Sequence, residues 1–196
     1  MADIRPFKAI RPAKGLEDKI AALPYDVYSR QEAVKAVEGN DKTFLRIERA
    51  ETCFDDSGDT YDDRVYEKAN ELFHGMLDAN EFVRDTRDCY YIYELTMDGR
   101  SQTGIVACAS IDDYQNNIIK KHENTRADKE ADRIRHVDAL SAQTGPIFLA
   151  YRANESINET IDAVKERPAI NDFVSDDGIR HRVWIIDDDK DIEVIC

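Results

Sequence analysis

The sequence predicts an α+β fold: a mixed, largely antiparallel sheet with two hairpins, and about four helices. Asp98-Gly99 separates two runs rich in β-branched and aromatic residues, and Asp176-Asp177-Gly178 precedes a similar run. Such turns between apolar runs are typical of hairpins. The predicted order is strand, helix, strand, helix, hairpin, helix, strand, helix, hairpin, which indicates a mixed α+β domain. We expect one domain over residues 1–196.

The first predicted elements are a strand, a turn and a short helix. Residues 4–12 alternate apolar and polar side chains, and their prolines favour an edge strand. Residues 24–27, Pro-Tyr-Asp-Val, predict a turn. Ser29 then suits the N-cap of a helix that runs to about Val37.

Two further segments precede the first hairpin. Residues 43–48 alternate again and predict a strand. Thr60 and Asp63 have the spacing of a capping box, so a long helix is expected to follow. Its predicted buried face consists of Val65, Ala69, Leu72, Phe73 and Met76.

The remaining elements follow the first hairpin. Thr125 and Asp128 repeat the capping spacing and predict a helix to about Ala142. Gly145-Pro146 ends it, and the apolar residues 147–151 predict a strand. Another helix fits residues 157–167.

Composition limits the classes of function. No stretch approaches the roughly 18 apolar residues that a membrane span needs, and the four cysteines lack zinc-ligand spacing. A reduced, cytoplasmic protein is therefore expected. The formal net charge of −14 disfavours binding to nucleic acid or to anionic membranes. A local pocket for a small anion remains compatible with it.

One basic segment stands out in this acidic chain. Residues 120–136 carry a formal charge of +2, and the rest of the chain carries −16. On a helix, Arg126, Lys129, Arg133 and His136 would lie within roughly 80° of one another. Arginine suits bidentate contact with phosphate or carboxylate, and lysine acts as a point charge. The segment therefore fits a site for a small anionic or phosphorylated metabolite.

The same segment also fits a salt-bridged helix face. Asp128, Asp132 and Arg135 could form ion pairs that contribute only a few tenths of a kcal/mol each. Charged runs are usually solvated surfaces. Both interpretations stay open on the residues alone.

Several neighbouring residues complete the predicted site. His122 beside Glu123 could act as acid or base near neutral pH, although a histidine in such a place more often faces water. Lys121 adds a further positive charge. The two histidines are too few and too loosely spaced to predict a metal site.

Two turns are also candidates for ligand binding. Tyr25 and Asp26 belong to the predicted turn near the start of the chain. Gln143 and Thr144 precede Gly145, and backbone N–H groups in such a turn can hold an anion. Each turn is explained equally well by its local backbone conformation.

Four segments resemble the bacterial and archaeal domain-of-unknown-function family 1015, and the similarity covers nearly the whole chain from Ala2. They are "ADIRPFKAIRP", "PYDVYSRQEA", "GRSQTGIVACASIDDY" and "IIKKHENTRADKEADRIRHVDALSAQTGPIFLAY". The resemblance also implies a role for the turn at Tyr25 and Asp26. Members are typically about twice this length, and their second half carries an Asp-Gly-His-His-Arg motif similar to that of ParB/sulfiredoxin-like proteins. This chain contains no such motif.

The resemblance implies an N-terminal region of a longer protein. Some of the wider relatives transfer phosphate from nucleotides, including to free serine. By this analogy the chain is part of a small-molecule phosphotransferase that uses ATP or ADP with Mg²⁺ and needs the C-terminal half for activity. The alternative is a non-catalytic metabolite-sensing or protein-interaction module, for instance a homodimer. The chain has no Gly-rich phosphate loop, GxSxG or HExxH motif.

Overall fold

The chain divides into two compact units in a computed structural model that describes residues 2–54, 58–121 and 126–195. Unit 1 comprises Met1–Lys14, Arg84–Glu123 and Leu149–Cys196, and unit 2 comprises Gly15–Val83 and Asn124–Phe148. Each unit is built from segments that are far apart in the sequence. No linker composition therefore marks a boundary, and the expected single domain stays a prediction.

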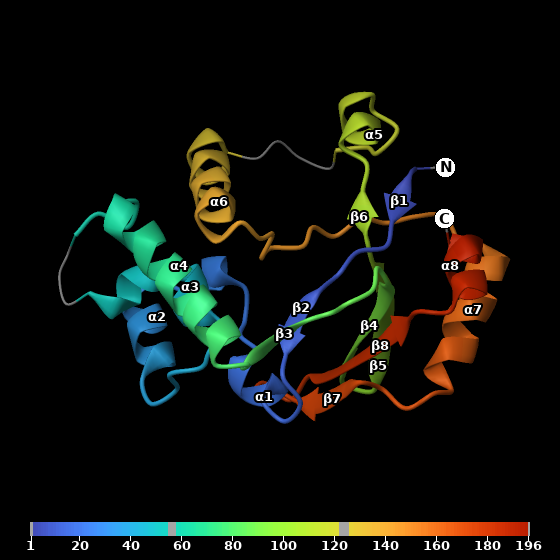
Figure 1. The fold of residues 1–196 in the computed structure, drawn as a ribbon, viewed down its shortest axis with the longest axis horizontal. Helices are drawn as coiled ribbons and strands as arrows, with labels where there is room; N and C mark the ends of the chain where they lie inside the picture. Colours follow the sequence, from blue (N-terminus) through green and yellow to red (C-terminus); the bar gives the residue numbers. More distant parts are fainter. Residues whose placement is uncertain (1, 55–57, 122–125, 196) are drawn as a thin grey trace. The chain divides into compact units, whose positions relative to one another are not determined.

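Unit 1 contains a four-stranded antiparallel sheet with the order β5-β4-β8-β7 (Figure 1). Both predicted hairpins are confirmed, and with them the α+β class. Asp98 and Gly99 have φ values of 50° and 75°, the left-handed conformation that a two-residue hairpin turn requires. The strands are β4 (Tyr90–Met97), β5 (Arg100–Val106), β7 (Asn171–Val174) and β8 (Arg180–Ile186).

One face of this sheet packs against two helices, α7 (Glu155–Lys165) and α8 (Asp189–Ile195). The side chain of Asn154 accepts a hydrogen bond from the Ile157 N–H and caps α7. The predicted helix therefore exists and begins two residues earlier than expected. The core consists of Tyr90, Ile92, Ile157, Ile161, Val164, Trp184, Ile186 and Ile195.

The smaller elements of unit 1 lie near its N-terminal segment. The predicted strand over residues 4–12 is divided into two short strands, and Phe7 between them exchanges backbone hydrogen bonds with Cys89. Strand β1 pairs with β6. The elements are β1 (Ile4–Arg5), β2 (Ile10–Pro12), β6 (Cys108–Ala109) and α5 (Ile111–Gln115).

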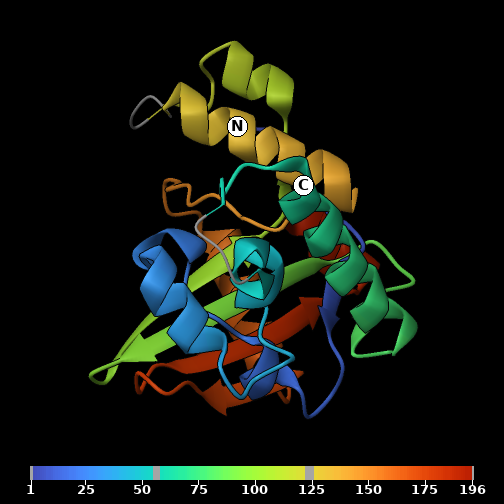
Figure 2. The same ribbon diagram turned by 90° about the vertical axis from the view of Figure 1, so that its left-hand side faces the viewer.

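Unit 2 is mainly helical, and its long helix α4 (Asp63–Asp78) packs against α3 (Leu45–Glu48) and α6 (Ala127–Leu140) (Figure 2). The predicted face of α4 is buried at all positions except the half-buried Leu72. The other elements are α1 (Glu17–Ile20), α2 (Arg30–Val37) and the 3₁₀ helices η1 (Tyr25–Val27) and η2 (Ala50–Cys53). Strand β3 (Phe82–Arg84) contains the passage from unit 2 to unit 1.

Of the helix caps predicted in unit 2, one is confirmed, one is wrong and one lies outside the described residues. Ser29 caps α2 in a capping box with Glu32, as predicted. At α4 the prediction was wrong, because the side chain of Asp62 accepts from the Arg64 N–H and takes the place expected for Thr60. Thr125 lies outside the described residues.

The strand predicted over residues 43–48 is wrong, because helix α3 occupies its second half. The N–H groups of Ile47 and Glu48 both bond to the carbonyl of Phe44, so local bonds replace a strand ladder. Leu45 and Ile47 are buried. A run of six residues cannot distinguish a strand from a single buried helical turn by its pattern alone.

The strand predicted over residues 147–151 is also wrong. This segment has no regular structure and pairs with no described strand. Ile147 and Phe148 are 71% and 79% exposed, so apolar composition did not lead to burial there. Among the helices of the described residues, none has both the length and the apolar character that crossing a bilayer requires.

Candidate functional site

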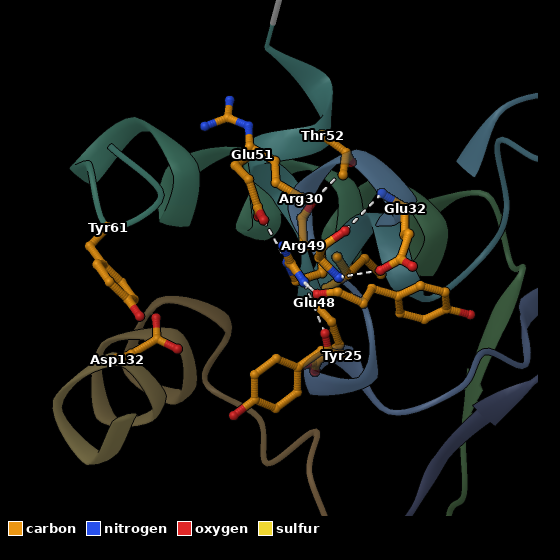
Figure 3. Close-up of polar contacts among 12 residues, drawn as sticks. Tyr25, Arg30, Glu32, Glu48, Arg49, Glu51, Thr52, Tyr61 and Asp132 are labelled. Carbon is orange, nitrogen blue, oxygen red and sulfur yellow. Dashed lines mark hydrogen bonds and ion pairs between the residues drawn. The ribbon is translucent and has the colours of Figure 1, made fainter. Parts of the chain in front are cut away.

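Unit 2 contains a pocket of about 270 Å³ lined by η1, α3, η2, α4 and α6. Figure 3 shows part of this region, with Tyr25 on η1, Glu48 on α3 and Asp132 on α6. Four segments that are distant in the sequence therefore contribute polar side chains to one cavity. This is the type of concave site that small ligands use.

Helix α6 contributes Lys129, Arg133 and His136 to the pocket lining. Their spacing of four and three residues places them on one face of the helix. Arg126, the fourth residue of the predicted face, is the N-cap residue and does not line the pocket. Its side chain is 75% exposed and pairs with Asp128 at 2.7 Å.

Arg133 is held by two carboxylates. Its Nη1 donates to Glu48 Oε2 at 2.7 Å, and its Nη2 donates to Asp132 Oδ2 at 2.8 Å. The guanidinium also lies over the Tyr25 ring, 4.1 Å from the centroid. Burial opposes the charge, but the two carboxylates outweigh it and raise the pKa of Arg133. The positive charge of Arg133 is therefore already balanced within the protein.

Asp132 is buried as part of the same network. The hydroxyl of Tyr66 donates to Asp132 Oδ1 at 2.7 Å. Burial first, and then the bond to Asp132, raise the pKa of Tyr66. Both oxygens of Asp132 consequently have donors, one from Tyr66 and one from Arg133.

Arg49 connects the turn at η1 to η2 through hydrogen bonds (Figure 3). Its Nε donates to Glu51 Oε1 at 2.5 Å, and its Nη1 donates to the carbonyls of Tyr25 and Tyr28 at 3.0 and 2.8 Å. The predicted ligand residues Tyr25 and Asp26 both line the pocket. The turn therefore has a defined structural attachment as well as a place in the cavity.

Two buried atoms of the pocket residues have no hydrogen-bond partner within the part of the chain that the structure describes: Glu48 Oε1 and His136 Nδ1. His136 is 3% exposed, and the Glu48 side chain is 9% exposed. His136 Nε2 lies 3.2 Å from the Ile47 carbonyl oxygen. Because that oxygen can only accept, Nε2 carries a proton, and in the neutral form of the ring Nδ1 is then an acceptor. Both unpartnered atoms therefore accept hydrogen bonds.

Lys129 is the pocket cation with the weakest internal partner. Its Nζ donates to the Tyr61 hydroxyl at 3.4 Å, and it forms no ion pair with any residue in the described part of the chain. A hydrogen bond of this length is weak, so a ligand could replace it and bind the ammonium group.

The other predicted site residues that the structure describes do not line this pocket. His122 and Glu123 lie outside the described residues. Lys121 belongs to unit 1, where its Nζ lies 4.5 Å from the Tyr114 ring centroid. Gln143 and Thr144 do not line the pocket, and Gln143 bonds to the Gly145 carbonyl. Within residues 2–54, 58–121 and 126–195, no group of three metal-ligating side chains is present.

The sequence interpretation missed the carboxylate side of the pocket. Glu48 and Glu51 were not considered, because residues 43–48 were expected to form a strand. A signal was present in "RIERAE", where each of Glu48 and Glu51 lies one or two residues from an arginine. Such a run of alternating charges is compatible with local ion pairs, and Arg49 does pair with Glu51.

Comparison with known proteins identifies the family. The family described as "Protein of unknown function (DUF1015)" matches residues 4–196, which is nearly the whole chain. No curated protein and no solved structure matches the chain. The family predicted from the four sequence segments is confirmed, while the likeness to ParB/sulfiredoxin-like proteins stays a prediction. The chain belongs to the DUF1015 family.

Proposed function

We propose that unit 2 holds the substrate site of a nucleotide-dependent phosphotransferase that acts on a small hydroxylated metabolite. The observation that carries this proposal is the buried, unpartnered Nδ1 of His136 among the residues that line the pocket. The type of reaction rests on analogy, through the resemblance described above, with ParB/sulfiredoxin-like proteins, whose motif belongs to the second half of family members and is absent from this chain. Free serine is one hydroxylated metabolite of this kind.

His136 is suited to the role of general base. A substrate hydroxyl would donate to Nδ1, and the proton would pass to Nδ1 as the oxygen attacks the terminal phosphorus of the nucleotide, whose bond to the bridging oxygen would break to release the nucleotide shortened by one phosphate. The Ile47 carbonyl accepts from Nε2–H and would hold the ring during the transfer. His122 and Glu123, which we proposed for acid–base chemistry from the sequence, lie outside the described residues and keep that role only as a proposal.

Lys129 is the preferred phosphate contact. ATP or ADP with Mg²⁺ would supply the phosphoryl chemistry, and a cation without an ion pair could approach its phosphate oxygens. Arg133 would have to give up Glu48 and Asp132 to do the same. We therefore assign Arg133 to the pocket wall and Lys129 to the phosphate.

A non-catalytic metabolite-sensing module is the second candidate. One observation favours it: the pocket lining contains four carboxylates and three cations. Arg133 and Arg49 are already paired, so few groups remain to stabilise phosphoryl transfer. In this alternative the same pocket would bind a metabolite without turnover.

The test combines calorimetric titration with ³¹P NMR spectroscopy on the chain of residues 1–196. The chain is titrated with ATP, ADP, serine and phosphoserine, with and without Mg²⁺. We expect nucleotide affinity to fall about tenfold in Lys129→Ala, the loss of one charged contact. Lys35→Ala on α2 is the control, because Lys35 is exposed and does not line the pocket.

The outcomes separate the two candidates. A phosphorylated product that disappears in His136→Gln supports the phosphotransferase. Metabolite binding with no product in a full-length homologue that carries the second half, also in the presence of nucleotide and Mg²⁺, contradicts it and favours the sensing module. No binding of any of these compounds would contradict both.

A further inference from the structure

We infer that the pocket of unit 2 selects ligands with a protonated amine, and that Glu48 Oε1 accepts a hydrogen of that amine while His136 Nδ1 accepts from the hydroxyl of the same ligand. The inference rests on the proposed function only for the location of the substrate. It concerns the charge and the donors of the ligand, which the proposed reaction does not fix.

The argument begins with the two acceptors. Glu48 Oε1 and His136 Nδ1 are buried atoms without partners, and their residues line the same pocket. A buried acceptor that has lost water is stabilised only when a donor replaces the water. A phosphate or carboxylate oxygen cannot serve, because it too accepts. The group that enters must bring hydrogens.

The number of donors favours an ammonium over a hydroxyl. A hydroxyl donates one hydrogen and could satisfy one of the two acceptors, whereas a primary ammonium donates three. Arg133 already donates to Glu48 Oε2, so Glu48 is oriented before a ligand arrives. A preformed acceptor of this kind needs little rearrangement on binding.

The pocket wall favours the same charge. Carboxylates outnumber cations among the lining residues, four to three. Four tyrosines also belong to the lining, and tyrosine rings attract cations through their faces. Arg133 and Arg135 already lie over the rings of Tyr25 and Tyr66, so Tyr28 and Tyr61 are the rings that a ligand cation could use. Lys129 is the one lining cation that has no ion pair among the described residues, and it precedes His136 by about two turns of α6.

The experiment follows the His136 ring nitrogens in ¹H–¹⁵N NMR spectra at neutral pH. Ethanolamine is the cationic probe, and ethylene glycol and glycolate are its neutral and anionic counterparts with the same two-carbon skeleton. We expect ethanolamine to shift the Nδ1 signal in a saturable way. Its affinity should exceed that of ethylene glycol by about tenfold or more, as expected for a charged over a neutral hydrogen bond.

Two variants locate the amine. Glu48→Gln should reduce the affinity for ethanolamine about tenfold or more, because the charge on the acceptor is lost. Glu38→Gln is the matched control, since Glu38 ends α2, is exposed and does not line the pocket. Unchanged backbone spectra outside the pocket would show that Glu48→Gln still folds. His136→Gln gives the second variant if it does not.

Three results would overturn the inference. Equal affinity for ethylene glycol would show that a neutral hydroxyl suffices. Stronger binding of glycolate would make this an anion site. No response to any probe would show that the two acceptors are inaccessible to ligands, either because protein atoms cover them or because water already donates to them. Amine binding without phosphoryl transfer in a full-length homologue would leave the inference standing and contradict the proposed reaction.

Discussion

Unit 1 and unit 2 each bury a glutamate among cations, but they complete the hydrogen bonds of that glutamate differently. In unit 1, Glu94 on β4 is 1% exposed. Arg182 donates to its Oε1, and Lys165 and Thr103 donate to its Oε2 at 2.6 and 2.8 Å. In unit 2, Glu48 has a donor on Oε2 alone.

The difference distinguishes the Glu94 network, which stabilises the fold, from the Glu48 network, which can bind a ligand. Every oxygen of Glu94 has a donor from the protein, and its cations Lys165 and Arg182 also lie over Trp184. Burial alone would raise the pKa of Glu94, but bonds from Lys165, Thr103 and Arg182 lower it. Glu48 and His136 remain incomplete, and incomplete buried acceptors are expected where a ligand supplies the donor.

The largest effect on stability is expected for Glu94→Ala. Removal of one partner from a buried ion pair costs about 3–5 kcal/mol, and we expect about 3 kcal/mol because Lys165 and Arg182 keep 26% and 30% side-chain exposure. Urea denaturation measures the change. A loss below about 1 kcal/mol, the range of exposed pairs, would show that the closed network contributes little.

The pH dependence of stability gives a second measure of the same network. The pKa of Glu94 is lowered on folding. Its contribution is therefore complete above the unfolded value of 4.5 and is lost as the pH falls through the lower folded value. Glu94→Gln should be less stable at pH 7 and should lose less stability than the wild type between pH 5 and the acid limit. Parallel pH profiles would contradict this assignment.

Tyr66→Phe tests the part of the pocket network around Asp132, where both carboxylate oxygens have protein donors. Its hydroxyl is the donor to Asp132 Oδ1, and Asp132 is buried. A carboxylate oxygen left without a donor costs about 2 kcal/mol. Tyr61→Phe is the control, because the Tyr61 hydroxyl only receives a 3.4 Å bond from Lys129. Equal stability of both variants in urea would mean that Asp132 finds another donor.

His136→Gln tests the part of the pocket network whose buried acceptors lack a donor among the described residues. Glutamine retains an N–H that can reach the Ile47 carbonyl, which is the hydrogen-bond partner of the His136 ring among the described residues. We expect the free energy of unfolding to change by less than about 1 kcal/mol, while the response to ethanolamine is lost. A loss of stability comparable to that of Glu94→Ala would instead make the ring a structural element.

The sequence was most informative where local signals decide the structure. The hairpin at Asp98-Gly99 follows from residues that tolerate positive φ, and the cap at Ser29 follows from one side chain and Glu32. The face of α4 follows from helical periodicity. These features depend on residues within one or two turns of one another.

The sequence was least informative where partners come from other segments. Lys129, Arg133 and His136 were predicted as site residues from their helical spacing, but Glu48 comes from α3, about 80 residues earlier, and reverses the expected charge of the site. The salt-bridged interpretation allowed for pairing by Asp132, which does pair with Arg133, but nothing in the basic segment indicates the second carboxylate, Glu48. The apolar pattern of residues 147–151 likewise could not show whether another segment would cover it.

Arg126→Ala gives the smallest expected effect and separates the two interpretations of the basic segment. Arg126 is 75% exposed and pairs with the exposed Asp128, and exposed pairs contribute little because water screens them. We expect no measurable change in urea stability or in nucleotide affinity, in contrast to Lys129→Ala. Weaker nucleotide binding in Arg126→Ala would mean that the ligand reaches beyond the pocket to the start of α6. The basic face would then act as a whole, as its spacing in the sequence first indicated.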